Sequence, residues 1–174
     1  MFGVRRSVRY HMRRAAFFDQ WGQVTSGLNV LFGSTAIASA LGALGADRAM
    51  VLSVAAGAVI TIVSTFDLII GSSRVAREHS DLAKRFIALE ATMSAVESPS
   101  SKWCAEFEAR RLSIEADERP IMRTLDVLCH NELAHALGHG EEATYRIGWI
   151  KRRLAQFVDF DTGGLRMVSE AKRR

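Results

Sequence analysis

The stretch MVLSVAAGAVITIVSTFDLIIG, residues 50–71, decides the fold class of this chain. It holds a single charged side chain, Asp67, close to its end. An α-helix needs about 20 residues, at ~1.5 Å per residue, to cross the ~30 Å hydrocarbon core of a bilayer. The stretch therefore predicts a membrane-spanning helix.

The same stretch carries eleven Val, Leu, Ile and Phe side chains. Each favours insertion by roughly 0.3 to 0.6 kcal/mol, so together they contribute about 3 to 7 kcal/mol before the cost of Asp67. Two interpretations of Asp67 stay open. It is either a carboxylate at the membrane surface paired with Arg74, or one member of an acidic ring at the inner mouth of an oligomeric pore that favours cations.

A second uncharged run precedes this one, because no charged residue lies between Asp19 and Asp47. Residues 21–44 are long enough to span a bilayer, and the link 45–48 is too short for a domain, so the two spans are expected to be antiparallel neighbours. The first span also contains Thr and Ser side chains and Asn29, and we expect it to need protein neighbours in lipid. Residues 21–72 are therefore predicted to form a transmembrane hairpin.

Arginine and lysine residues flank both ends of the hairpin, whereas its connecting turn has no net charge. The positive-inside rule then places both termini in the cytoplasm. Residues 1–19 alone carry a charge of +4, so the basic composition describes a membrane flank and no duplex nucleic acid is expected as a partner. The residues assigned to lipid headgroups are Arg5, Arg6, Arg9, Arg13 and Arg14.

Small residues recur every four positions on both predicted spans, and small side chains let helices approach closely in lipid. These stripes either close the hairpin or face other subunits or a pore. Since two helices cannot enclose a channel, any pore requires a homo-oligomer. The candidates for pore lining or helix packing are Asn29, Ser34, Thr35, Gly42, Ser53, Gly57, Thr61, Thr65 and Asp67.

The remainder of the chain shows helical spacing and no alternating strand pattern, which predicts an all-α protein. Expected helices cover residues 75–96, continuous with the second span, then 102–119, a third from Pro120 to near Gly138, and a fourth from Glu141 and Glu142 in which Ile147, Ile150, Leu154 and Phe157 share a face. The predicted layout is a basic juxtamembrane segment (1–20), which forms a helix, the hairpin (21–72), a cytoplasmic helical domain (73–162) and a basic tail (163–174).

The sequence contains no complete catalytic or metal-binding motif. His130 and His135 lie five positions apart instead of the four of a zinc-protease helix, and His135 and His139 have the right spacing but no evident third ligand. No phosphate loop, nucleophile elbow or paired carboxylates occur, so neither a metal, a cofactor nor an enzymatic activity is expected. A basic cluster around a tryptophan has three interpretations: nucleotide binding, contact with anionic lipid, or a solvated basic face on a packing helix. It consists of Arg146, Trp149, Lys151, Arg152 and Arg153.

Two segments carry a family resemblance. Arg9-Tyr10-His11, Arg13-Arg14, Phe17-Phe18-Asp19 and Val30-Leu31-Phe32-Gly33-Ser34 come before or within the first span; His79, Leu82, Arg85-Phe86 and Leu89-Glu90 follow the second. Together with the two-span topology, these residues resemble the SLATT family, the SMODS and SLOG-associating two-transmembrane effector domain. The likeness covers roughly residues 9 to 96.

The resemblance implies a membrane effector of a bacterial anti-phage defence system that permeabilises or depolarises the inner membrane, which is a form of abortive infection. It also implies control by a nucleotide second messenger or by a nucleotidyltransferase partner. Two other functions remain open. One is a non-conducting membrane scaffold or regulator, and the other is a phage lysis protein of holin type.

Overall fold

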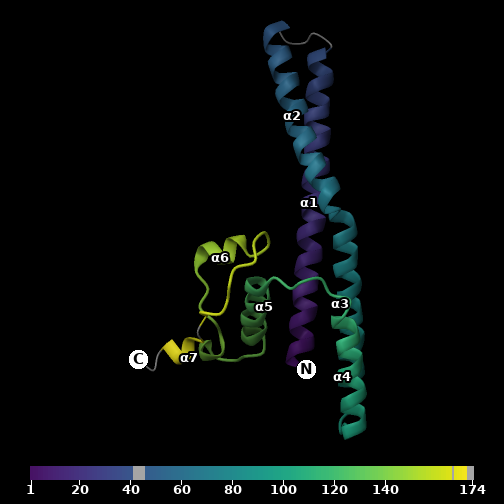
Figure 1. The fold of residues 1–174 in the computed structure, drawn as a ribbon, viewed down its shortest axis with the longest axis vertical. Helices are drawn as coiled ribbons and strands as arrows, with labels where there is room; N and C mark the ends of the chain where they lie inside the picture. The colour runs from purple at the N-terminus through teal and green to yellow at the C-terminus, as the bar shows by residue number, and fades with distance from the viewer. Residues whose placement is uncertain (41–45, 166, 172–174) are drawn as a thin grey trace. The chain divides into compact units, whose positions relative to one another are not determined.

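The computed structural model describes residues 1–40, 46–165 and 167–171, and this part of the chain is helical, with no strand. The all-α prediction is confirmed for these residues. The elements are α1 (Phe2–Ala40), α2 (Ala46–Ile70), α3 (Ser72–Ser94), α4 (Ser101–Glu115), α5 (Arg123–Ala136), the short 3-10 helix η1 (Glu141–Ala143), α6 (Trp149–Leu154) and α7 (Val168–Ala171), as labelled in Figure 1.

The chain forms two compact units whose bounds differ from the predicted ranges. One unit is Ala15–Glu78, and the other combines Met1–Arg14 with His79–Arg174. The first turns of α1 therefore belong with the C-terminal part of the chain rather than forming a separate segment. The physical reason is that Val4 and Tyr10 are buried against residues more than 70 positions later.

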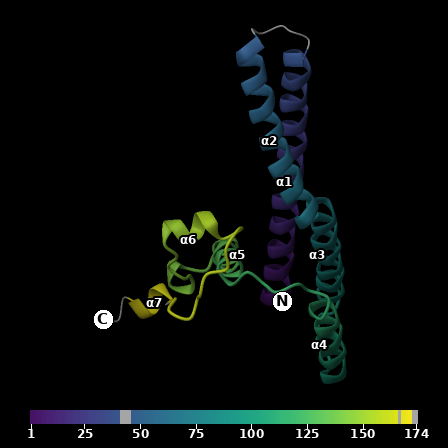
Figure 2. The same cartoon turned by 45° about the horizontal axis from the view of Figure 1, so that its top comes forward.

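In the unit Ala15–Glu78, the later part of α1 lies alongside α2 (Figures 1 and 2). A hydrogen bond from Ser64 Oγ to Asn29 Oδ1, 3.0 Å long, joins the two helices. Thr25 and Ala56 are each 4% exposed. Asn29 and Ser64 thus satisfy each other between the helices.

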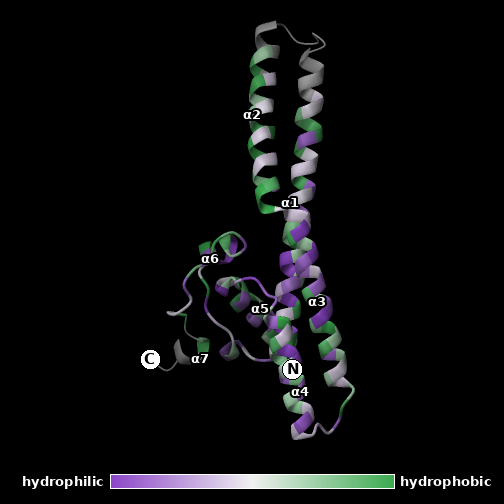
Figure 3. Ribbon diagram, turned by 45° about the vertical axis from the view of Figure 1, so that its right-hand side comes forward, coloured by the Kyte–Doolittle hydropathy of each residue, from purple (hydrophilic) through white to green (hydrophobic). Residues whose placement is uncertain are grey.

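Helix α2 shows mostly hydrophobic colours in Figure 3. Of the described residues, the helical stretch Ser53–Ser94 is the one that is long and apolar enough to cross a membrane, and 6% of its most apolar part is buried. Phe66 is 57% exposed, Leu68 83% and Ile69 73%. The large side chains of α2 are therefore largely uncovered by protein.

Gly71 separates α2 from α3, where the sequence predicted one continuous helix. Its φ of +64° lies in the left-handed region that glycine adopts without a steric cost. The amide of Gly71 still bonds the carbonyl of Asp67, and the amide of Val75 bonds the carbonyl of Gly71, so the break is local. Ser72 Oγ donates to Asp67 at 2.5 Å, whereas Arg74 pairs with Glu78 at 3.8 Å. Of the two interpretations of Asp67, the one that paired it with Arg74 differs from these contacts.

The other unit has two apolar clusters. Val4, Leu82, Phe86, Leu89 and Ile114 form the first, which joins α1, α3 and α4, and the spacing of α3 correctly predicted its buried face. Tyr10, Leu125, Cys129 and Ala155 form the second, which joins α1 to α5 and the end of α6. Cys104, on α4, is exposed.

The predicted fourth helix is wrong in its bounds. Residues 144–148 separate η1 from α6, which starts only at Trp149. The cause is a distant side chain, because Asn131 on α5 accepts from the amide of Tyr145 at 2.9 Å and donates to its carbonyl at 2.8 Å. Both backbone groups of Tyr145 are thereby withdrawn from helix formation.

Replacing Phe86 by alanine is expected to destabilise the protein by about 3 to 5 kcal/mol, because the ring is fully buried and leaves a cavity. The matched control is Ile87→Ala on the same helix, whose side chain is 46% exposed. Denaturant unfolding in detergent, followed by circular dichroism, compares the two. Equal losses for both variants would contradict the assignment of the core.

Candidate functional site

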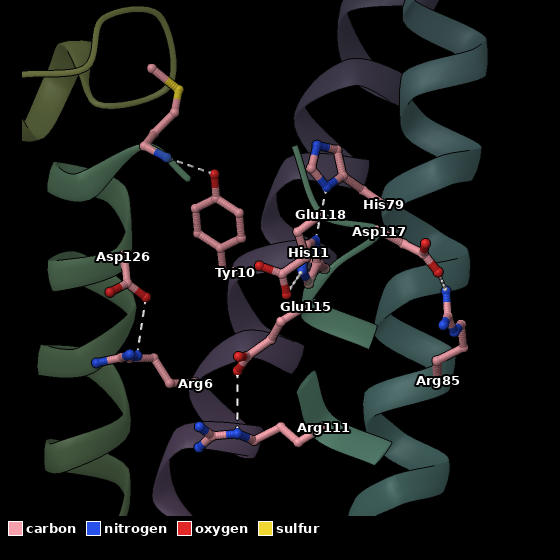
Figure 4. Close-up of polar contacts among 11 residues, drawn as sticks. Arg6, Tyr10, His11, His79, Arg85, Arg111, Glu115, Asp117, Glu118 and Asp126 are labelled. Atoms are coloured by element: carbon pink, nitrogen blue, oxygen red, sulfur yellow. Dashed lines mark hydrogen bonds and ion pairs between the residues drawn. The ribbon is translucent and has the colours of Figure 1, made fainter. Parts of the chain in front are cut away.

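A chain of three polar side chains crosses the interior of the unit formed by Met1–Arg14 and His79–Arg174 (Figure 4). Nδ1 of His11, on α1, lies 2.9 Å from Nδ1 of His79, on α3. Nε2 of His11 lies 3.0 Å from Oε1 of Glu118, which follows α4. The two imidazoles are 1% and 4% exposed, and the Glu118 side chain 6%. We call these residues the His11 cluster.

The contacts restrict where protons sit. An ionised Glu118 only accepts, so Nε2 of His11 carries a hydrogen. A hydrogen bond between the two Nδ1 atoms then requires that one of them, and not both, carries a hydrogen. Either Nδ1 of a neutral His11 accepts from His79, or a protonated His11 donates to a neutral His79.

Burial keeps His79 uncharged in this position. Desolvation, followed by the nearby charges of His11, Arg14 and Arg119, lowers the pKa of His79 from 6.5 to about 4. A charged His79 would place a second cation against His11 in a region of low dielectric. Acid is therefore expected to weaken the contact between α1 and α3.

Aromatic rings enclose the His11 cluster. Phe86 stacks on His11, with ring centroids 5.6 Å apart and 12° between the planes, and Tyr10 meets His11 edge-on at 5.3 Å. The Tyr10 hydroxyl accepts from the amide of Met122 at 2.9 Å, and burial raises the pKa of Tyr10. Because these rings close the site to solvent, the cluster links helices rather than presenting a base to a substrate.

Four of the residues that carry the family resemblance meet here: Tyr10, His11, His79 and Phe86. Their residue types and spacing in the sequence indicate no role for them. The one sequence signal that these four residues belong together is that they lie in the two segments that carry the resemblance.

The N-terminal arginines mostly contact other parts of the protein. Arg5 pairs with Glu90 at 2.6 Å, Arg6 with Asp126 at 3.1 Å and Arg13 with Glu132. Arg14 donates to the Gln156 carbonyl at 2.8 Å. These contacts tie α1 to α3, α5 and the segment after α6, a role that the assignment to lipid headgroups did not foresee.

Arg9 is exposed, as is Arg13. It lines an open groove of about 690 Å³ together with Arg5 and Arg13, while Met12 and Leu137 contribute apolar walls. Glu90 and Glu132 also line this groove and already pair with Arg5 and Arg13. The groove is therefore close to neutral.

The predicted small-residue candidates do not all lie together. Asn29 faces α2 through Ser64, and Asp67 accepts from Ser72. Ser34, Gly57, Thr61 and Thr65 are exposed, and Ser53 is half-buried. Gly42 lies outside the described residues, as does the side chain of Thr35. A Cβ atom added at Gly57 would meet no described atom within 4 Å.

The basic cluster lies on α6, except for Arg146, which lies between η1 and α6. Arg146, Trp149, Arg152 and Arg153 are exposed, and Lys151 is half-buried with its ammonium donating to the Asp161 carbonyl at 3.1 Å. Helix α6 itself contributes no buried side chain. Ala155, at the end of this helix, is buried in the cluster with Tyr10 and Leu125.

In the HNELAH segment, residues 130–135, His130 packs against its surroundings, whereas His135 is exposed. His130 Nε2 lies 3.1 Å from the Ala143 carbonyl, and the ring of Phe2 meets the His130 ring edge-on at 5.0 Å. Across the described parts of the chain, no group of three or more His, Cys, Asp or Glu side chains is arranged to hold a metal ion.

No protein-family model matches the chain, and neither the curated proteins nor the solved structures provide a match.

Stability is expected to rise with pH between about 4 and 6.5. Because the pKa of His79 is lowered on folding, the unfolded chain binds the extra proton in this window, so the stabilisation is complete above about 6.5 and is lost as the pH falls to about 4. The difference between the two pKa values corresponds to at most about 3 kcal/mol. Thermal unfolding in detergent across this range measures it.

His79→Gln should flatten this part of the pH profile, whereas His135→Gln, at an exposed position, should leave it unchanged. An unaltered slope in His79→Gln would show that another group causes the acid sensitivity.

Proposed function

We propose that this chain is a membrane effector of a bacterial anti-phage defence system, similar to SLATT proteins, and that it assembles into an oligomeric gated pore in the inner membrane. The observation that carries the proposal is α2, a helix long and apolar enough to span a bilayer, with large side chains that the protein leaves uncovered. Lipid would supply the missing apolar surroundings.

In this proposal, α2 and the later part of α1 cross the membrane as an antiparallel hairpin with both termini in the cytoplasm. The bond between Ser64 and Asn29 supports it, because a polar pair that satisfies itself between helices avoids the cost of unpaired groups in hydrocarbon. The described residues of the two spans, 21–40 and 50–70, are helical, so the backbone groups inside them bond within their own helix.

The outward stripe of α2 supports assembly. Gly57, Thr61 and Thr65 are exposed, and the Thr61 hydroxyl donates to the Gly57 carbonyl of its own helix at 2.8 Å. Ser34 on α1 likewise donates to Val30 at 2.7 Å. These small residues present no unsatisfied hydroxyl at those two positions and would let the helices of a second copy approach closely.

The His11 cluster is the proposed point of control. It joins α1, whose later residues enter the hairpin, to α3, which follows α2 in the chain. A nucleotide signal or a partner protein that separates these two helices would act on segments that lead directly into the spans. The trigger would work by shifting a closed state to an open one.

The first test is dye release from liposomes that contain the full chain. Gly57→Leu should reduce release and intersubunit crosslinking by at least about tenfold, because a bulky side chain blocks close helix approach. Val59→Leu is the matched control on another face of α2, where the wild-type side chain is already large and 40% exposed. Depolarisation of expressing cells provides the same comparison in vivo.

Stable insertion without leakage, under any nucleotide or during phage infection, would contradict the pore. It would favour the second candidate, a non-conducting scaffold or regulator. One observation favours that candidate: Met1–Arg14 and His79–Arg174 form a compact unit with two apolar clusters of its own, as an anchored interaction module requires. A holin-type lysis protein would instead be revealed by phage lysis genes beside its own.

A further inference from the structure

Helix α6 and the residues after it expose a group of large apolar side chains. Trp149 is 75% exposed, Ile150 52%, Leu154 41% and Val158 45%. Of the neighbouring residues, Ala155 is buried, in the cluster with Tyr10 and Leu125. We call the four exposed side chains the Trp149 patch. They are uncovered although the segment that carries them is fixed to the protein interior through Ala155.

Cations accompany this patch. Arg146, Lys151, Arg152 and Arg153 lie within eight positions of one another. The nearby carboxylates Asp159 and Asp161 are engaged by Arg123, at 3.6 and 3.7 Å. In the part of the chain that the structure describes, Arg152 and Arg153 are exposed and form no ion pair, so their charges are available to a partner.

The mixture of side chains distinguishes between the possible partners. A nucleotide would contact the cations and the Trp149 ring, but it offers no apolar surface to cover Ile150, Leu154 and Val158. A bilayer surface uses all of them: tryptophan lies at the headgroup level, aliphatic side chains enter the acyl boundary, and lysine and arginine meet lipid phosphates. The positive charge selects anionic headgroups.

We propose that the Trp149 patch docks on the surface of an anionic bilayer. The inference rests on the proposed function for its setting, because the surface is that of the membrane which the hairpin enters. Docking would hold the C-terminal segment of the chain at the membrane through weak, salt-sensitive contacts.

The test uses the full chain with Trp21→Phe and Trp103→Phe, so that Trp149 is the remaining tryptophan. The protein is reconstituted into vesicles of brominated phosphatidylcholine, with or without phosphatidylglycerol. Trp149 fluorescence should shift to the blue and be quenched about twofold more when phosphatidylglycerol is present. The difference should disappear at about 1 M salt, where charges are screened within ~3 Å.

The charge variant Arg152→Gln/Arg153→Gln should lose the phosphatidylglycerol dependence. Lys102→Gln/Arg110→Gln, which removes two exposed cations elsewhere in the same unit, should retain it. A second measurement needs no tryptophan replacement. Trypsin should cleave the natural chain at residues 151–153 several-fold more slowly in vesicles with phosphatidylglycerol than in phosphatidylcholine alone.

Extraction with alkaline carbonate separates docking from insertion. A chain that resists extraction while Trp149 stays unquenched and trypsin cleaves equally in both lipids overturns the docking and leaves the proposed function intact. A chain that is extracted, yet shows Trp149 quenching on phosphatidylglycerol, supports the docking and contradicts the hairpin. A third outcome would identify the patch as a nucleotide site and make the proposal wrong. In it, ATP alters Trp149 fluorescence in vesicles of phosphatidylcholine alone, whereas adding phosphatidylglycerol to the vesicles has no effect.

Discussion

The apolar side chains of α2 find few protein atoms to pack against, and this constrains the rest of the molecule. Ile62 and Phe66 are each 57% exposed, and Leu68 is 83% exposed. Apolar surface gains ~25 cal/mol per Å² when it leaves water, so a helix of this kind is stable only where something apolar surrounds it. In the proposed function a bilayer would meet that requirement, and it would account for the bond between Asn29 and Ser64 and for those of Ser34 and Thr61 to their own helices.

The unit of Met1–Arg14 and His79–Arg174 is held together by polar as well as apolar contacts. There the N-terminal turns of α1 are held by ion pairs with Glu90, Asp126 and Glu132, and by the buried contact between His11 and His79. Burial raises the pKa of Asp126, and the nearby charge of Arg6 opposes that rise. Helix α1 thus contributes charged residues to the unit of Met1–Arg14 and His79–Arg174, and mainly uncharged residues to the unit Ala15–Glu78.

The helices themselves followed from periodicity and from the proline and glycine positions, because those signals are local. The His11 cluster did not, since its members are 68 and 107 positions apart in the chain. For the same reason the arginines near the N-terminus were assigned to lipid, because a sequence gives the sign of a charge but not the distant carboxylate that meets it. Likewise, the helix predicted from Glu141 begins only at Trp149, because Asn131 bonds the backbone of Tyr145, 14 positions later in the chain.

The two cysteines differ in a way that is useful for measuring motion. Burial raises the pKa of Cys129 to about 11, so its sulfur remains a protected thiol, whereas Cys104 lies exposed on α4. Because the thiolate is the reactive form, maleimide reagents will modify Cys104 and spare Cys129. The natural polypeptide therefore accepts a spin label or fluorophore at one defined position without mutagenesis.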